Sequence, residues 1–288
     1  MNDVPNKPHD PIRAEQDPLL DDRQLRERDY HEEFAHRHRD KASEGVQLDV
    51  IEPGPRRPWN GHWTAYDFLT AETDLASKRV MVPGCGLGDD AIRLAKLGAE
   101  VNAFDLSPDL LDIARRRAAS MGIVGIHFDV MPAEGLGYPD NFFDLVYFND
   151  ILHHIDIPRA IAETLRVLKP NGRVIANELY THSLLQRIRE SRFVSRFLYH
   201  RMVRFIYGPE RPYITEDEHK IDEHELAVLT ATLQPGSLRL RYFLFLGGRL
   251  LPTDWLGVAK FDRAFLAMIG PLGRIFAGRV VLVGTVAK

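Results

Sequence analysis

The 288-residue chain has little cysteine, no long apolar run and no large excess of either charge. Its single cysteine, Cys85, excludes an internal disulfide and is typical of a reducing compartment. The formal net charge of −4 argues against a nucleic-acid backbone as the main partner. No apolar stretch is long enough to cross a bilayer, and the charged N-terminus lacks the apolar core of a signal peptide. We therefore expect a cytoplasmic protein that does not bind nucleic acid.

The most informative segment is a glycine-rich loop between a short apolar run and a helical pattern. Residues 80–82 lead into Pro83-Gly84-Cys85-Gly86-Leu87-Gly88, and an amphipathic pattern follows at once. Glycines let the backbone approach a ligand closely, and a helix N-terminus favours an anionic group. About twenty residues further on, Asp105 ends a second strand, where a carboxylate binds a ribose diol in such folds. Together the two features indicate an adenosine-containing cofactor.

Strand and helix patterns alternate regularly after a proline-rich linker at 53–58. Such alternation predicts a parallel sheet with helices on both faces. The expected strands lie near residues 79–83, 101–104, 124–128, 143–148, 172–177, 237–246 and 279–286.

In this order, and with Leu-His-His at 152–154 and Leu-Lys-Pro-Asn-Gly at 168–172, the segments resemble the class I S-adenosylmethionine-dependent methyltransferases. The resemblance covers roughly residues 60–288. It implies a Rossmann-like α/β fold, with a seven-stranded, mostly parallel sheet, an antiparallel last strand, helices on both faces and a helical insertion. It also implies S-adenosylmethionine as the cofactor. Two alternatives stay open: a protein that binds this cofactor without catalysis, and a nicotinamide-dependent oxidoreductase, which the G-x-G-x-G spacing and the last strand disfavour.

The expected organisation has three parts. Residues 1–20 are predicted to be a disordered tail, because they are polar and rich in proline. Residues 21–58 are expected to form an N-terminal helical lid and linker. Residues 59–288 are expected to form the methyltransferase domain, with a helical substrate cap inserted at about 181–220.

The resemblance places the loop under the methionine part of the cofactor and Asp105 on both ribose hydroxyls. Two positions depart from the family pattern: Pro83 stands where an acid is usual, and Pro132 stands where an acid usually precedes alanine. The loop around Pro83 is similar to that of thiopurine methyltransferase relatives, and Asp129 is a displaced candidate for adenine. The expected cofactor-binding residues are Pro83, Gly84, Cys85, Gly86, Gly88, Asp105, Leu106, Met131, Pro132, Ala133, Asn149 and Asp150.

Candidate catalytic residues follow the fourth and fifth expected strands. His153 or His154 has the right pKa range for a general base, and Glu178 is placed to orient an amine or a hydroxyl. Methyl transfer from a sulfonium is an in-line displacement, so positioning of donor and acceptor alone can supply much of the acceleration. We expect no metal.

An arginine-rich insertion leaves the choice of partner open. Residues 184–207 carry six arginines against one acid, Glu190, together with apolar residues at helical spacing. They are expected to contact an anionic membrane or lipid-like substrate, to bind an anionic group on the acceptor, or to complete the core or a homodimer contact. Many large apolar side chains at 247–278 favour a small, hydrophobic acceptor.

Overall fold

A computed structural model describes residues 20–51, 61–72, 74–180, 184–189, 191–207, 221, 223–247, 250–252 and 255–288. The expected tail at 1–20 and linker at 53–58 therefore lie outside the described residues, except for Leu20. In the part of the chain that the structure describes, no helix is long and apolar enough to span a membrane.

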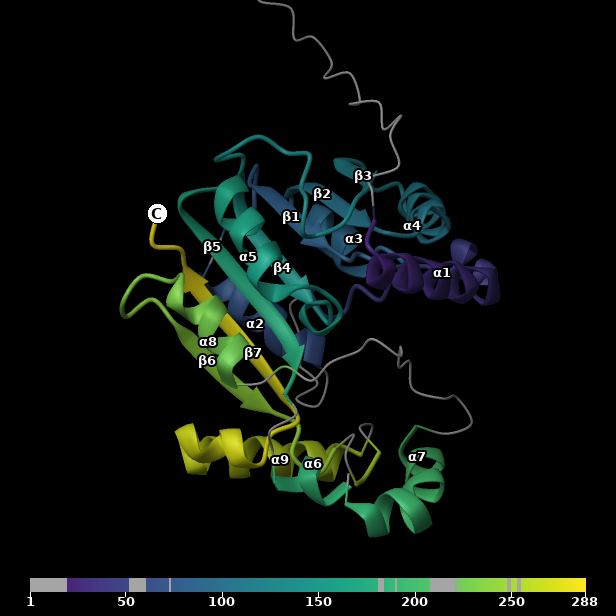
Figure 1. Cartoon of the computed structure of the whole chain (residues 1–288), viewed down its shortest axis with the longest axis vertical. Coiled ribbons are helices and arrows are strands. Elements are labelled where there is room, and N and C mark those ends of the chain that lie inside the picture. The colour runs from purple at the N-terminus through teal and green to yellow at the C-terminus, as the bar shows by residue number, and fades with distance from the viewer. Residues whose placement is uncertain are drawn as a thin grey trace, which may run out of the picture.

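Seven strands form a single sheet with the order β3-β2-β1-β4-β5-β7-β6 (Figure 1). The first five strands pair in parallel, whereas β7 is antiparallel to both β5 and β6. This arrangement confirms the predicted Rossmann-like sheet. The strands are β1 (Arg79–Pro83), β2 (Glu100–Asp105), β3 (Ile126–Val130), β4 (Phe143–Asn149), β5 (Leu168–Leu179), β6 (Arg239–Phe243) and β7 (Arg279–Thr285).

Helices cover both faces of the sheet and continue into a separate cap. One apolar cluster packs α2 and α3 against the sheet, and another packs α5 and α8 on the sheet. The helical segments are α1 (Asp22–Arg37), η1 (Arg39–Ser43), α2 (Gly61–Glu72), α3 (Asp89–Lys96), α4 (Pro108–Ser120), η2 (Leu152–His154), α5 (Ile157–Val167), α6 (Leu184–Arg189), η3 (Val194–Leu198), α7 (Tyr199–Tyr207), α8 (Glu223–Ala231), α9 (Leu256–Ile269) and η4 (Gly270–Ile275).

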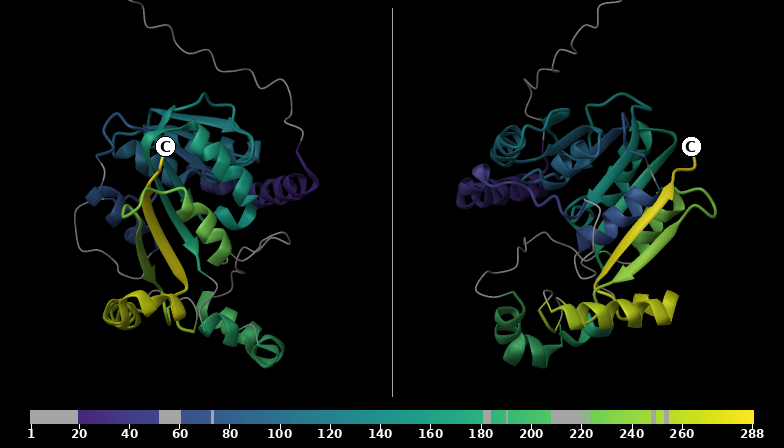
Figure 2. Two further views of the ribbon diagram at one scale, coloured as in Figure 1. Left: turned by 60° about the vertical axis from the view of Figure 1, so that its left-hand side comes forward. Right: turned by 180° about the vertical axis from the view of Figure 1, so that it is seen from behind.

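The cap helices lie beyond one edge of the sheet, where α9 contacts the end of β6. Figures 1 and 2 show α6, α7 and α9 together as a layer below the ends of β5, β6 and β7. The insertion is not one continuous helix, because the π-helical turn η3 separates α6 from α7. The ring of Phe205 in α7 meets that of Trp255, just before α9, edge-on at 6.1 Å. The two cap segments, about fifty residues apart in sequence, are therefore in contact.

Three strand predictions differ from the structure by two or more residues. The sixth strand, expected at 237–246, is shorter, because β6 spans only Arg239–Phe243. The third strand begins two residues later than expected, because Gly125 has a left-handed φ of 82° and regular strand backbone starts at Ile126. The fifth strand is twice as long as expected: pairing to β4 begins at Leu168 and a register shift carries the ladder past the turn residues. The sequence did not predict this extension, because Pro170 and Asn171 are typical of a turn.

Candidate active site

The loop at 84–88 has a backbone that requires glycine. Gly84, Gly86 and Gly88 have φ values of 58°, 50° and 81°, all left-handed. At Gly84 a Cβ atom would lie 2.4 Å from Cδ1 of Ile151. The loop is tied to β2, because the backbone N–H of Cys85 donates to the carbonyl of Phe104 over 3.0 Å. The loop is thus held tightly against the ends of β2 and β4.

Asp105 links the loop to the following helix. Its side chain accepts hydrogen bonds from the backbone N–H of Gly86 (2.9 Å) and of Ser107 (3.1 Å). Ser107 in turn caps α4 by accepting from the N–H of Leu110. Asp105 is only 5 % exposed, and it lines a cavity at the end of β2. The carboxylate is therefore fixed before any ligand binds, which is the pre-organisation that a ribose-binding acid needs.

This cavity has a volume of about 100 Å³ and lies between the loop and α1. The space above Gly86 is open, since a Cβ atom there would meet no atom within 4 Å. The lining combines the loop, the ends of β2 and β4, and one side of α1: Arg23, Gln24, Glu27, His31, Gly84, Gly86, Phe104, Asp105, Leu106, Met131, Ala133, Glu134, Asp150, Ile151, His154 and Ile155.

A buried acid, Glu134, fastens α1 over this cavity. Its two oxygens accept hydrogen bonds from Arg23 (2.5 Å), Gln24 (2.8 Å) and the backbone N–H of Asp156 (2.9 Å). Arg23 also donates to the backbone carbonyl of His154. Glu134 directly follows the Met-Pro-Ala segment expected at adenine, yet the sequence pattern gave no reason to connect it with α1.

A second buried acid, Glu27 of α1, lies between two histidines. Glu27 is buried, and its oxygens lie 3.6 Å from Nε2 of His31 and 3.5 Å from Nδ1 of His154. Burial lowers the pKa of His31, but the hydrogen bond to Glu27 and the negative charges of Asp105 and Glu27 outweigh it and raise this pKa above its usual value. The polar face of α1 thus packs on the cavity, although the sequence of this helix suggested little that it could bury.

A second cavity, of about 200 Å³, lies on the other side of the loop and is lined by Pro83, Gly84, Cys85 and Asn149 among others. The buried carboxylate of Asp90, at the start of α3, also lines it. Asp90 accepts hydrogen bonds from the Tyr66 hydroxyl (2.9 Å), Arg93 (3.1 Å) and the Asn149 amide (2.9 Å). Burial raises the pKa of the Cys85 thiol well above its usual value, so this thiol stays protonated.

The loop after β4 is held from β5. One oxygen of buried Glu178 accepts from the backbone N–H groups of Ile151 (3.0 Å) and Leu152 (2.9 Å), and the other lies 3.1 Å from Nδ1 of His153. Asp150 pairs with Arg279 over 2.6 Å. Asp150, His153 and Glu178 are close enough together to share an ion, but each carboxylate already has protein donors.

Most of the expected cofactor-binding residues lie around these two cavities. Gly88, Pro132 and Asp129 line neither. Gly88 instead lets α3 approach α4, since a Cβ there would lie 2.7 Å from that of Ala114. Asp129 accepts from the Tyr138 hydroxyl over 2.8 Å. Of the expected catalytic residues, His154 lines the cavity under α1, whereas Glu178 lines a small apolar pocket on the α8 side.

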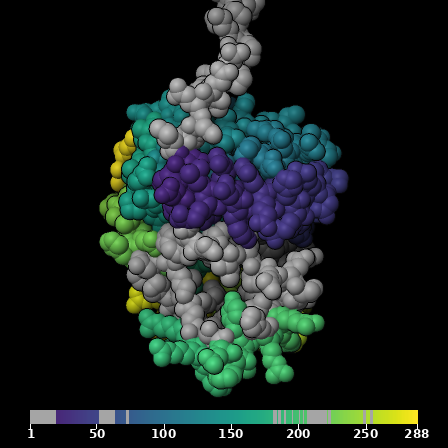
Figure 3. Space-filling model, turned by 45° about the vertical axis from the view of Figure 1, so that its right-hand side comes forward, coloured from purple at the N-terminus to yellow at the C-terminus, as the bar shows by residue number. Residues whose placement is uncertain are grey.

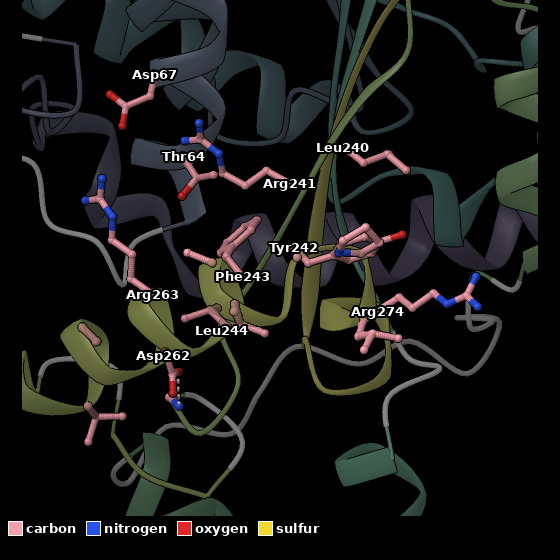
Figure 4. Close-up of a pocket in the computed structure, with 18 of the residues that line it drawn as sticks. Thr64, Asp67, Leu240, Arg241, Tyr242, Phe243, Leu244, Asp262, Arg263 and Arg274 are labelled. Atoms are coloured by element: carbon pink, nitrogen blue, oxygen red, sulfur yellow. Dashed lines mark hydrogen bonds between the residues drawn. The ribbon is translucent and has the colours of Figure 1, made fainter. Parts of the chain in front are cut away.

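A larger groove lies elsewhere, between α2, β6 and α9 (Figure 4). It has a volume of about 930 Å³ and a mainly apolar lining that includes Tyr242, Phe243, Leu244 and Leu266. Arg241, Arg263 and Arg274 reach its edges. The groove includes the carboxyl end of β6, which runs parallel to β5 and so ends at the same edge of the sheet as the loop cavities.

Residues 81–176 match the family model of the methyltransferase domain. These residues, about a third of the chain, are similar to a methyltransferase domain. It is 34% identical over 129 residues to a ubiquinone biosynthesis O-methyltransferase of Xanthomonas oryzae, which is 44% of this chain and 54% of that protein. It is 31% identical over 131 residues to the ubiquinone/menaquinone biosynthesis C-methyltransferase of Zymomonas mobilis, 45% of this chain and 52% of that protein. The chain thus spans about half the length of the curated relatives it matches.

Solved structures agree on the fold of the methyltransferase domain. A geranyl diphosphate C-methyltransferase from Streptomyces coelicolor, in complex with S-adenosyl-L-homocysteine, aligns with a TM-score of 0.57 and 16% identity. The alignment covers 93% of this chain and 99% of that one. The [4+2]-cyclase SpnF aligns with a TM-score of 0.56 and 19% identity, over 91% and 96% of the two chains. At such identities the likeness establishes the fold alone.

The domain family implies S-adenosylmethionine as the cofactor, and the residues present fit it. The left-handed glycine loop leaves open space over Gly86, and the fixed carboxylate of Asp105 faces the same cavity. Asp90 and Asn149 supply polar groups on the other side of the loop. The site therefore has a donor and acceptor set for both the ribose and the amino-acid part of the cofactor.

Proposed function

We propose that the protein transfers a methyl group from S-adenosylmethionine to a small, apolar or lipid-like acceptor. The observation that carries this proposal is the pairing of the glycine loop with Asp105 at the end of β2. The cofactor supplies a methyl group on a sulfonium, which is open to in-line displacement. The role of the protein is then to hold donor and acceptor in line and to exclude water.

The departures from the family pattern have local replacements. Pro83 offers no carboxylate, but Asp90 lies beside the loop on the first turn of α3 and is held there by Tyr66 and Asn149. We assign Asp90 to the ammonium end of the cofactor. The loop with Pro83 is, in this proposal, a variant similar to that of thiopurine methyltransferase relatives. Asp105 takes the ribose, and Met131 and Ala133 border the adenine.

The histidine pair has two different roles in this proposal. Nδ1 of His153 lies 3.1 Å from an oxygen of Glu178, and His153 is, in this proposal, the base that takes a proton from the acceptor. Glu178 acts through His153 and through the backbone of the loop, so it is a positioning residue. His154 packs against Glu27 and Arg23, and therefore joins α1 to the cavity.

The α1 helix acts as a lid in this proposal. The cavity that it covers is about 100 Å³, whereas ligand pockets usually have about 300–1,000 Å³. Entry of the cofactor therefore requires α1 to move and to exchange its contacts with Glu134 and Glu27. The lid would then close again over the bound cofactor and keep water from the sulfonium.

A groove at the carboxyl edge of the sheet supports an apolar acceptor. The mainly apolar groove of about 930 Å³ opens there, and arginines lie at its rim. Such a surface suits an apolar molecule that carries an anionic group. The relatives named for ubiquinone and menaquinone biosynthesis favour a lipid-like acceptor, although the match covers only half of each.

The test is calorimetric titration with S-adenosylhomocysteine, followed by methyl transfer to a panel of lipophilic phenols, alcohols and amines. For Asp105→Ala we expect a loss of affinity of about 2–4 kcal/mol, because two charge-assisted hydrogen bonds disappear. Asp129→Ala is the matched control, since Asp129 lies near the end of the neighbouring strand β3 but accepts a hydrogen bond from Tyr138 outside the cavity. Equal affinity in the two variants would overturn the site. Binding by the wild type without turnover of any acceptor would favour the non-catalytic alternative.

A further inference from the structure

The cap exposes large apolar side chains that no described part of the chain covers. Phe193 and Phe197 lie beside each other, with ring centroids 5.5 Å apart, and are 65 % and 63 % exposed. On α9, Met268 is 76 % exposed. The other exposed members of this surface, which we call the cap face, are Leu184, Ile188, Leu198, Phe205, Trp255, Leu256, Phe261, Leu272 and Ile275.

The apolar surface of α9 is a regular helix face. Ala259, Asp262 and Leu266 are buried and face the rest of the protein, whereas Phe261 and Met268 lie on the opposite side of the helix. A helix that only completed the core would place polar residues on that outer side. The α9 helix is apolar on both sides, which indicates a second apolar partner.

Among the described residues of the cap, the exposed charges are of one sign. Exposed cations of the cap are Arg187, Arg192, Arg196, Arg201, Arg204, Lys260, Arg263 and Arg274. Within the described residues of 184–207 and 255–275, Asp262 is the one acid. It is buried and accepts from the backbone N–H groups of residues 245–247. The exposed charge of the described cap is therefore entirely positive.

From these observations we propose that the cap face docks on an anionic lipid bilayer. Aromatic and aliphatic side chains would enter the acyl boundary while the arginines remain among the headgroups. A second copy of the chain fits less well, because a two-fold contact through this face would bring arginines against arginines. The space-filling view of Figure 3 shows the green atoms of the α6–α7 segment at the lower end of the molecule.

Docking of the cap face on a bilayer would bring the site close to a lipid-like acceptor. The cap lies at the carboxyl edge of the sheet, where the groove between β6 and α9 also opens. A lipid-like acceptor could then pass from the bilayer to the site without crossing water. The docking itself needs no methyl transfer, so it can be tested whether or not the proposed function holds.

The experiment is co-sedimentation of the full chain with vesicles of phosphatidylcholine, with and without phosphatidylglycerol. We expect binding only to the vesicles with phosphatidylglycerol, and weaker binding as salt is raised. The variant with Phe193→Ser, Phe197→Ser, Phe261→Ser and Met268→Ser should lose at least about tenfold in binding, because inserted apolar area is removed. Replacing Arg192 and Arg263 by Gln should cost about fivefold for each cation lost.

Val124→Ser is the matched control, because Val124 is 85 % exposed but precedes β3 at the other edge of the sheet. It should bind vesicles like the wild type. Every variant is checked for an unchanged unfolding transition and unchanged titration with S-adenosylhomocysteine, which separates this proposal from the proposed function. Absence of wild-type binding, or full binding by the four-serine variant, overturns the proposal. So does a wild-type dimer that the four-serine variant converts to monomer.

Discussion

The cofactor site and the cap differ in which side chains they bury and which they expose. Around β1, β2 and β4, charged side chains are buried: Asp90, Asp105, Glu134 and Glu178 are all nearly inaccessible and are held by protein donors. In the cap, large apolar side chains such as Phe197 and Met268 are exposed. The first arrangement makes a rigid site for a polar cofactor. The second adds little to the core and leaves surface for an apolar partner.

The same contrast separates two helices, α1 and α9. The sequence of α1 is strongly polar, yet α1 buries Gln24, Glu27 and Ala35. The sequence of α9 is largely apolar, yet α9 leaves Phe261 and Met268 in solvent. Polar groups are therefore buried where they can bond one another, and apolar groups stay exposed where the sheet offers them no partner.

The largest effect that tests this contrast comes from two phenylalanines. Phe148 is fully buried in β4, whereas Phe197 lies on the cap face. Phe148→Ala should lower the free energy of unfolding by about 3–5 kcal/mol through loss of transfer energy and a residual cavity. Phe197→Ala should change it by less than about 0.5 kcal/mol. Chemical denaturation measures both, and similar losses would mean that the cap is packed as a second core.

The second test uses two loop glycines with similar backbones and different surroundings. Alanine at Gly86 or Gly88 meets a left-handed φ, which costs about 1–2 kcal/mol. At Gly88 the new Cβ also overlaps Ala114, which adds about 1–3 kcal/mol. At Gly86 the Cβ enters open space, so Gly86→Ala should be the more stable variant and yet lose more affinity for S-adenosylhomocysteine. The reverse order of affinities would place the cofactor elsewhere.

The smallest expected effect is a pH dependence at α1. Glu27 and Asp105 raise the pKa of His31, and His154 lies nearby with ring centroids 6.4 Å apart. A raised folded-state pKa means stabilisation that is complete below about pH 6.5, the unfolded value, and is lost as the pH rises through the folded value. His31→Gln should remove this dependence, which is worth about 1 kcal/mol because the His31 side chain is 21% exposed. Unfolding of both proteins between pH 5.5 and 8 measures it; parallel curves would assign the effect to another group.

The fold was largely predictable because its signals are local. Each signal spans only a few neighbouring residues. These signals are the apolar strand before the glycines, the acid at the end of β2, and the regular alternation of strand and helix patterns. The site was predictable only where it lies on that loop. The partnership of Glu134 with Arg23 joins residues 111 positions apart, and no periodicity reports such a contact. Asp90 was likewise missed, since an acid on the first turn of a helix has an ordinary role at the helix dipole.

By itself, the sequence determined the sheet, the loop and the order of its elements, because strand and helix periods and glycine turns act over a few residues. Only the tertiary structure decided which polar groups meet and which apolar groups remain uncovered. It directed the charged face of α1 onto the cavity, turned Glu178 toward the backbone after β4, and placed α7 beside the start of α9. These contacts depend on distances across the fold, which the spacing of residues along a chain does not contain.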